Sequence, residues 1–211
     1  MIKILPFYPY RYKEYAESLY QALVADPFYQ AMEKAAEGES SEVTTKEIML
    51  RYFDYSMSEA FKQSALYLLE DNTCGAAVWS LPLHEMLLAQ KHQDKRDFLE
   101  SYMGVRCRDL YQDIVAAMDE VSQEYVEEED WYLSITGVHP TWQGKGYGKD
   151  LLMPKLKEAD ETQTRVFLET FTPDSNAKFY EKLGFSAATT ETEPTIGASY
   201  TLMIREPQNP E

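Results

Sequence analysis

The sequence predicts a mixed α/β fold, and three observations lead to that class. Apolar runs on both sides of a polar turn favour a β-hairpin over residues 65–81. A strand pattern at 131–138, a helix pattern at 146–161 and a strand pattern at 165–170 are typical of a crossover between parallel strands. A short helix and two more strand patterns follow. Strands and helices are therefore interspersed, as in a helix-covered sheet.

Four segments are expected before the hairpin. Residues 2–7 favour a short first strand. Apolar side chains at helical spacing from Tyr12 to Leu23 predict an amphipathic helix that ends by Asp26-Pro27. The polar stretch 37–47 is interpreted as a loop, and a second helix is expected from Thr45 onward.

The later elements follow from the same patterns. Between residues 85 and 125 the chain is charged and lacks proline, which favours one or two long helices. Pro154 lies inside the 146–161 helix and is expected to kink it, because proline removes a backbone N–H. The remaining elements are expected at 175–183 (a helix ended by Gly184), 186–192 and 199–205 (strands) and 206–211 (a disordered tail).

Composition limits the function classes. The net charge of −16 makes nucleic acid and membrane surfaces poor partners and favours cationic ligands. Residues 1–142 carry 12 Lys and Arg against 25 Asp and Glu, so residues 143–211 are the nearly neutral part. Cys74, Cys107 and three histidines show no ligand spacing, which predicts no metal site. No secretory signal is evident, so the cytoplasm is the expected location.

A glycine-rich segment at 138–149 follows a predicted strand and opens a predicted helix. The first turn of a helix exposes unpaired N–H groups and partial positive charge. Glycine lets such a backbone approach an anion closely. Lys145 and Lys149 add positive charge, so the segment predicts a phosphate-binding loop.

Three phosphate-binding patterns compete for this loop. Lys149 is followed by Asp150 where a P-loop needs Ser or Thr, and the glycine spacing is one residue short. The run Gly144, Gly146, Gly148 is GxGxG, whereas the dinucleotide fingerprint needs GxGxxG near the start of the chain. The pattern that remains is Q/R-x-x-G-x-G/A, which begins at Gln143.

This pattern resembles the GNAT superfamily of N-acetyltransferases. A segment about 30 residues later, N-x-x-F-Y-x-K-x-G-F from Asn176 to Phe185, is similar to that family's second cofactor segment. The resemblance covers about residues 131–186. It implies a mostly antiparallel, twisted sheet of six or seven strands with a splayed central parallel pair. It also implies one domain over 1–211, with the substrate side at about 8–130.

The resemblance assigns roles residue by residue. The strand before the loop would pair with the pantetheine arm of acetyl-CoA through Thr136, Gly137 and Val138. Asn176 would contact the same arm, and Tyr180 would protonate the departing thiolate, since a phenol stays protonated at neutral pH. The backbone that would hold the pyrophosphate comprises Gln143, Gly144, Lys145, Gly146, Tyr147 and Gly148.

The general base is less defined, because an alkyl amine is almost wholly protonated at pH 7. Glu169 ends one strand beside the expected site, and Glu129 and Asp130 precede another. His139 is interpreted as a turn residue because Pro140 follows it. Aromatic residues are dense in the first 60 positions; most are expected in the core and some in a substrate pocket.

These observations predict acetyl transfer from acetyl-CoA, as co-substrate, to a primary amine in a ternary complex. The acceptor is expected to be a small-molecule or peptide amine, and a homodimer is left open. Two alternatives stay open: a non-catalytic acyl-CoA-binding module, and an O-acyl or longer-chain acyltransferase.

Overall fold

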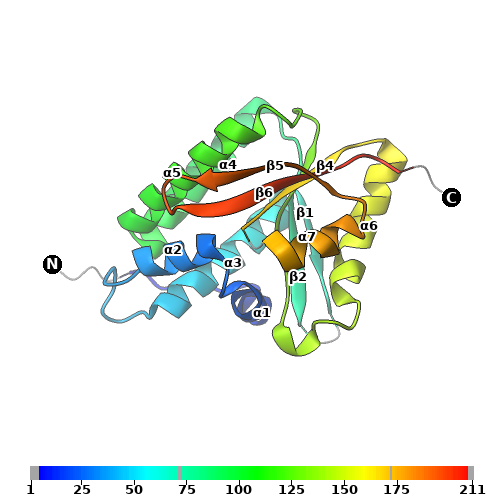
Figure 1. Ribbon diagram of the computed structural model, residues 1–211. Coiled ribbons are helices and arrows are strands. Elements are labelled where there is room, and N and C mark those ends of the chain that lie inside the picture. Colours follow the sequence, from blue (N-terminus) through cyan, green and yellow to red (C-terminus); the bar gives the residue numbers. More distant parts are fainter. Residues whose placement is uncertain (1–4, 71–72, 172, 209–211) are drawn as a thin grey trace.

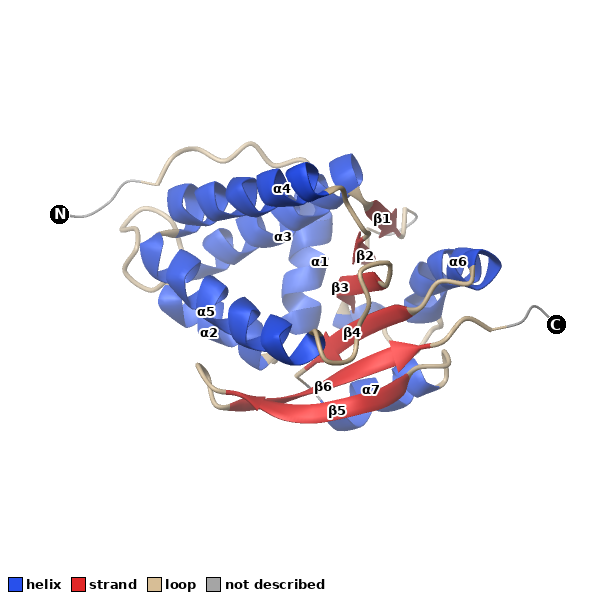
Figure 2. Ribbon diagram, turned by 90° about the horizontal axis from the view of Figure 1, so that it is seen from above, coloured by secondary structure: helices blue, strands red, loops and turns tan. Residues whose placement is uncertain are grey.

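The computed structural model describes residues 5–70, 73–171 and 173–208. Among these residues, six strands form one sheet in the order β1-β2-β3-β4-β6-β5. Figure 1 shows the sheet crossing the molecule, and Figure 2 shows α1–α5 on one face and α6 and α7 on the other. The strands are β1 (Ala65–Leu68), β2 (Gly75–Ser80), β3 (Trp131–Val138), β4 (Val166–Thr170), β5 (Ser186–Glu193) and β6 (Ala198–Arg205). The helices are α1 (Lys13–Leu23), α2 (Pro27–Ala35), α3 (Thr45–Gln63), α4 (Glu85–Phe98), α5 (Val105–Ser122), α6 (Tyr147–Thr162) and α7 (Pro173–Glu181).

The sheet is mostly antiparallel, with one parallel pair at its centre. β3 and β4 run parallel, and the other four neighbouring pairs are antiparallel. The β3–β4 crossover passes through α6, as the strand–helix–strand pattern predicted. The mixed α/β fold with a central parallel pair is therefore confirmed.

A β-bulge in β3 is a feature that the sequence pattern did not indicate. Val78 pairs with Ile135 and Trp79 pairs with Leu133, so Ser134 is the extra residue. The Ser134 hydroxyl donates to the Val78 carbonyl at 3.1 Å. Because of the bulge, Leu133 packs in the core under α6, whereas Ile135 packs in the core under α1 and α3.

Helix α1 approaches the sheet closely at Gly137. A Cβ added there would lie 2.9 Å from the Cβ of Ala22, closer than real Cβ contacts allow. Glycine thus lets α1 lie directly on β3. On the other face, α6 buries Leu151, Leu152 and Leu156 against the sheet.

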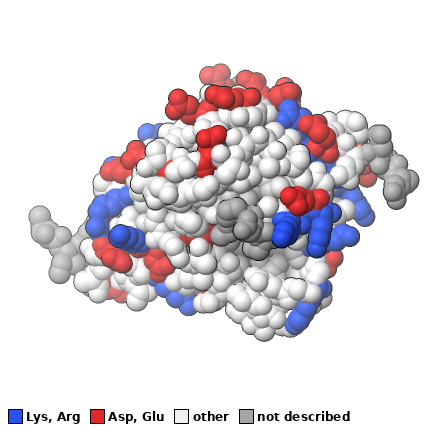
Figure 3. All heavy atoms as spheres, viewed as in Figure 1, with Lys and Arg blue, Asp and Glu red and all other residues white. Residues whose placement is uncertain are grey.

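Charge is unevenly spread over the surface. Figure 3 shows acidic side chains gathered along the upper edge of one face, and basic ones on both its left and right sides. Among the helices of the described residues, none combines the length and hydrophobicity needed to cross a membrane.

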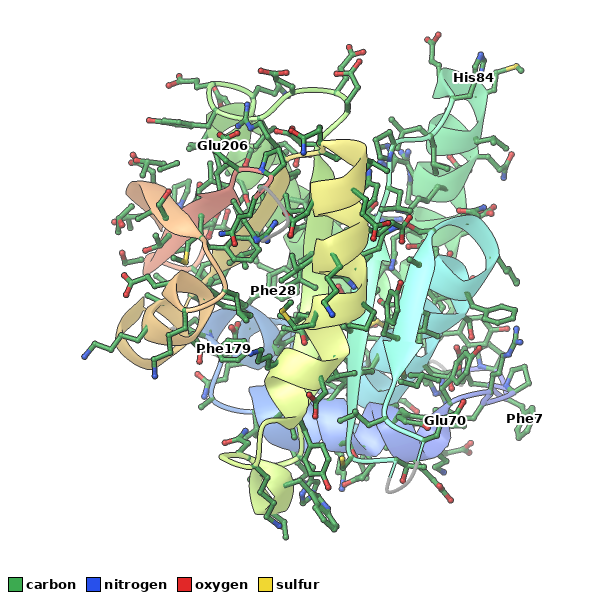
Figure 4. All side chains as sticks on the ribbon, turned by 90° about the vertical axis from the view of Figure 1, so that its right-hand side faces the viewer. Phe7, Phe28, Glu70, His84, Phe179 and Glu206 are labelled. Atoms are coloured by element: carbon green, nitrogen blue, oxygen red, sulfur yellow. The ribbon has the colours of Figure 1, made fainter. Side chains whose placement is uncertain are left out.

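Two early predictions fail. The strand expected at 2–7 is not formed by residues 5–7, and Phe7 is 87% exposed and points away from the protein (Figure 4); residues 1–4 lie outside the described part. Helix α2 was not predicted from the sequence. Asp26-Pro27 does end the first helical segment, but it begins another, because Asp26 caps α2 and Pro27 occupies its first position.

The long helical stretch is split in two. α4 continues into a π-helical turn at Leu99–Met103, and Gly104, with φ of +101°, separates it from α5. The hairpin turn at 71–72 lies outside the described residues. So do residues 209–211 of the expected disordered tail, whereas the Gln208 N–H still donates to Asp160 at 2.7 Å.

Candidate functional site

The two central strands separate after a short shared ladder. β3 and β4 pair only through Trp131 with Val166 and Tyr132 with Phe167. Farther along β3, residues 136–138 pair with β2 on one side and lie beyond the ladder on the other. The β3 backbone that the sequence assigned to the pantetheine arm therefore borders the opening between the strands.

The glycine loop lies where β3 gives way to α6. Gly144 and Gly146 have φ angles of +75° and +93°, and Gly146 is the N-cap of α6. A Cβ at either position would have nothing within 4 Å, so this part of the loop backbone faces open space. The Gln143 side-chain amide donates to the Val138 carbonyl at 2.9 Å, which ties the loop to the end of β3. Lys145 lies over the Trp142 ring, 4.3 Å from its centroid.

Helix α7 packs against this loop. A Cβ at Gly148 would lie 3.1 Å from Cζ of Phe179, so glycine permits the close contact between α6 and α7. Figure 4 shows Phe179 on α7 beside the first turn of α6. Tyr180, the next residue, packs in the same core cluster as Val138 of β3 and Leu168 of β4. Asn176 is half-buried on the same helix.

Tyr180 is buried, with 9% of its surface exposed. Its ring contacts Phe179 and Phe185 at centroid distances of 5.2 and 5.8 Å. Burial raises the pKa of the Tyr180 phenol, and the nearby charge of Asp26 raises it further. The hydroxyl thus stays protonated at neutral pH, the state that a proton donor needs.

Asp26 is the site residue that sequence reasoning missed. It lies at the start of α2, where its carboxylate accepts the Phe28 N–H at 2.9 Å. Burial raises the Asp26 pKa to about 6, against the lowering effect of the Phe28 and Tyr29 N–H groups. A carboxylate with this pKa is largely ionised at pH 7 and can still accept a proton. The Asp-Pro pair marks a helix start, but only the fold shows that this start lies near Tyr180.

Glu169 lies at the end of β4 and faces α5. Its carboxylate accepts the Ser122 hydroxyl at 2.8 Å and the Tyr132 hydroxyl at 3.0 Å. Burial raises the Glu169 pKa, and these two hydrogen bonds act in the opposite direction. Both oxygens are thus engaged by hydroxyl donors, an arrangement that suits a positioning role.

The acidic turn before β3 lies at the end of that strand opposite the glycine loop. Glu129 is exposed and precedes β3, at the end opposite the glycine loop. Asp130 is buried and accepts the Glu127 N–H at 2.9 Å. The structure therefore brings neither carboxylate to the loop end of β3. His139 caps the 3₁₀ turn Pro140–Trp142 by accepting the Thr141 N–H at 3.3 Å, a turn role as expected.

An aromatic cluster lies between Asp26 and Glu169. Phe28 stacks on Phe171 with centroids 6.5 Å apart and meets Tyr111 edge-on at 6.1 Å. Tyr29 and Tyr52 are 6.1 Å apart. These side chains come from α2, α3, α5 and the end of β4, so the cluster forms only in the folded chain. It is described below as the aromatic cluster of Phe28, Tyr29, Tyr52, Tyr111 and Phe171.

The described part of the chain shows neither a disulfide nor a metal centre. Cys74 and Cys107 are both buried and free. Within residues 5–70, 73–171 and 173–208, no group of three or more His, Cys, Asp or Glu side chains is arranged to hold a metal ion.

The chain is similar to a known protein family and to several solved structures. Residues 108–187 match the family model described as acetyltransferase (GNAT) domain. Arylalkylamine N-acetyltransferase 2 from Aedes aegypti is similar at a TM-score of 0.61 and 14% identity, covering 93% of this chain and 94% of that chain. A histone acetyltransferase HPA2 and related acetyltransferase from Corynebacterium glutamicum gives 0.62 and 15%, covering 98% and 99%. The polyamine N-acetyltransferase of Drosophila melanogaster gives 0.52 and 14%, covering 92% and 96%.

At these identities the solved structures show a shared fold. Together with the family model over α5 to the start of β5, they define an acetyltransferase class of protein. The chain has a GNAT-type fold, and its residues 108–187 match the GNAT acetyltransferase domain.

Proposed function

We propose that this protein transfers an acetyl group from acetyl-CoA to a primary amine. The observation that carries the proposal is the opening between β3 and β4, which ends on a glycine loop at the start of α6. Free main-chain N–H groups at such a helix start suit a pyrophosphate. Residues 136–138 would pair with the pantetheine arm, and Asn176 would contact it.

Acetyl-CoA supplies the activated acetyl thioester, and the residues of this chain move two protons. Asp26 accepts a proton from the acceptor ammonium, which frees the nitrogen lone pair for attack on the thioester carbonyl. As the new C–N bond forms and the C–S bond breaks, Tyr180 donates its proton to the departing sulfur, and the nitrogen releases its second proton to solvent. The amide product, a free thiol and one released proton result, and proton transfer from Asp26 to Tyr180 through solvent restores both groups.

Asp26 is preferred to Glu169 as the base on two grounds. The charge of Asp26 raises the pKa of Tyr180, so the two groups are close. Glu169 already binds two hydroxyl groups. Glu169 would instead hold Tyr132 in place beside the acceptor, and Glu129 is too exposed at the far end of β3 to act on the reacting atoms.

The acceptor is proposed to be an amine with an apolar part. The aromatic cluster supplies apolar and cation-attracting surface, and Asp26 and Glu169 supply negative charge. Two proteins of similar fold bear the names arylalkylamine and polyamine N-acetyltransferase, which is consistent with such acceptors. The acidic surface favours cationic partners and disfavours nucleic acid. We place the reaction in the cytoplasm, where the two free cysteines would stay reduced.

The proposal is tested by thiol release from acetyl-CoA across a panel of amines. Wild-type protein should release thiol only when an accepted amine is present. Tyr180→Phe should lower kcat about 100-fold, because the departing sulfur loses its proton donor. The affinity for CoA, measured by calorimetry, should change by less than about twofold, since the phenyl ring still fills the same space.

Tyr67→Phe on β1 is the matched control, and it should leave both quantities unchanged. Equal losses of kcat and CoA affinity in Tyr180→Phe would assign the hydroxyl to binding rather than catalysis. A protein that binds CoA but releases no thiol with any amine would be the non-catalytic module.

A further inference from the structure

A cavity lies outside the candidate transfer site, between α3 and α4. It has a volume of about 460 Å³, and Tyr8 and Pro9 also line it. The residues that α3 contributes lie at 54–55, 58–59 and 62–63, which is one face of the helix at one-turn spacing. No lining residue belongs to the glycine loop, α7 or the aromatic cluster. The volume is typical of small-molecule sites.

One wall of this α3–α4 groove is a stack of aromatic rings. Tyr55 and Phe98 stack with centroids 4.0 Å apart and ring planes 16° apart. Phe98 and Tyr102 stack in turn at 5.7 Å, and Tyr8 meets Tyr102 edge-on at 5.2 Å. Tyr102 and Ser101 are carried by the π-helical turn, a rare conformation that occurs frequently at functional sites. Aromatic faces of this kind attract cations.

Two side chains that line the groove, Glu59 and Gln63, each carry a buried acceptor atom without a donor. One oxygen of Glu59, Oε2, lies 3.5 Å from the Lys95 ammonium. The other, Oε1, is buried and has no hydrogen-bond partner among the described residues, and the same holds for Oε1 of Gln63. A buried acceptor without a donor costs free energy, so both atoms favour a ligand that brings N–H groups.

The charge of the groove also favours a ligand that brings N–H groups. Asp54, Glu59, Asp94 and Asp97 line it, against one lysine, Lys62. The Asp54 carboxylate is already occupied by the Tyr8 hydroxyl and the Arg11 N–H, both at 2.9 Å. Glu59 pairs with Lys95 through Oε2, and Asp94 and Asp97 each accept a glutamine side-chain N–H at 2.7 Å through Oδ1, so the second oxygen of each carboxylate is the one offered to a ligand. An anion would be repelled, and a neutral apolar molecule would leave the two acceptors unsatisfied.

We propose that the α3–α4 groove binds an organic cation that combines a flat apolar body with a protonated, N–H-rich group. The body stacks on the Tyr55, Phe98 and Tyr102 rings, and the N–H groups donate to Glu59 and Gln63. The groove is a ligand site of its own, separate from the place where acetyl transfer is proposed.

Benzamidine is a suitable probe, because it is aromatic, carries a charged amidinium and has no alkyl amine to acetylate. Its binding to CoA-free protein is measured by calorimetry, beside benzamide, which has the same shape without the charge. Benzamidine should bind at one site and benzamide at least about tenfold more weakly, because a charge-assisted hydrogen bond is lost.

Two groove variants and two controls locate the site. Ser101→Trp fills the groove from an exposed position, and Glu59→Gln removes the charged acceptor; each should weaken benzamidine binding about tenfold or more. Glu85→Gln, an exposed change on α4, and Asp26→Asn should leave it unchanged. Thermal unfolding checks folding, since Glu59→Gln deprives Lys95 of its partner, whereas Ser101→Trp leaves that pair intact.

The proposal is overturned by any of three results. Benzamidine fails to bind at millimolar concentration, or benzamide binds equally well. Alternatively, binding survives Ser101→Trp and is lost in Asp26→Asn, which would place the cation in the transfer site. Acetyl transfer is measured separately, so failure of the groove proposal leaves the proposed reaction standing.

Discussion

The two faces of the sheet present different chemistry to the proposed substrates. On the side of α6 and α7, the loop offers main-chain N–H groups and depends on Gly144 and Gly146 for its shape. On the side of α1–α5, tyrosines and carboxylates from separate helices converge on Asp26 and Glu169. A main-chain site is broken by changes in backbone conformation. A side-chain site is broken by removing single functional groups, so the two faces should respond to different variants.

The largest effect is expected from Gly146→Val. A β-branched residue strongly resists a φ of +93°, so the loop would change conformation and lose amide contacts to the pyrophosphate. Losing two charge-assisted hydrogen bonds, about 4 kcal/mol together, weakens CoA binding about 1,000-fold. Calorimetry with CoA measures this loss.

Gly197→Val is the matched control for that experiment. Gly197 also has a positive φ, +65°, and open space around it, but it lies in the turn between β5 and β6. It should lower the melting temperature as much as Gly146→Val does and leave CoA affinity intact. Equal CoA affinity in both variants would remove the loop from the cofactor site.

Asp26→Asn should lower kcat/KM about 100-fold at pH 7, because the amide cannot accept the acceptor's proton. Asparagine still caps α2, so the helix start is kept. In the wild type, kcat/KM should fall tenfold per pH unit below about 6, where Asp26 becomes protonated. That inflection should be absent from Asp26→Asn. An unchanged pH profile would exclude Asp26 as the base, and Asp113→Asn, an exposed change on α5, is the control.

Asp26→Asn is expected to lower activity without lowering stability, because the buried Asp26 carboxylate destabilises the folded protein when it is ionised. Folding raises the Asp26 pKa from its ordinary value of 3.8 to about 6, so ionisation opposes folding as pH rises between these values. Stability from this group is full below pH 4 and lost above pH 6. Asp26→Asn should therefore melt at or above the wild-type temperature at pH 8. A large drop there would indicate a structural role for the carboxylate.

The difference between the faces also explains what the sequence could reveal. The loop is one contiguous segment, and its residue types indicate its shape. Gly146 has a positive φ, Gly148 allows the close contact with Phe179, and Gln143 donates to the Val138 carbonyl. Tyr180 lies within a second contiguous segment. The other face is assembled from α2, α3, α5 and β4, so Asp26 gives only a helix-capping signal. Its proximity to Tyr180 depends on tertiary packing, and so does the engagement of Glu169 by Ser122.

Two departures from regular secondary structure could not be predicted from the sequence either. The bulge at Ser134 and the π-helical turn at Leu99–Met103 each add a residue to a regular element, and no residue type marks either. Residues 5–7 of the strand predicted at 2–7 form no strand, and Phe7 is exposed.

The smallest effect on the reaction is expected from Glu169→Gln, which separates a base from a positioning residue. Glutamine keeps one acceptor oxygen and turns an N–H group toward Ser122 or Tyr132, whose hydroxyl can accept it, so a charge-assisted hydrogen bond becomes a neutral one at a cost of about 1 kcal/mol. Chemical denaturation should show that loss, and kcat/KM should fall by less than about threefold. Glu161→Gln, an exposed change on α6, is the control for stability. A 100-fold loss of kcat with an intact melting temperature would instead make Glu169 the base. The pH profile of Asp26→Asn would then still show the fall in kcat/KM below about pH 6.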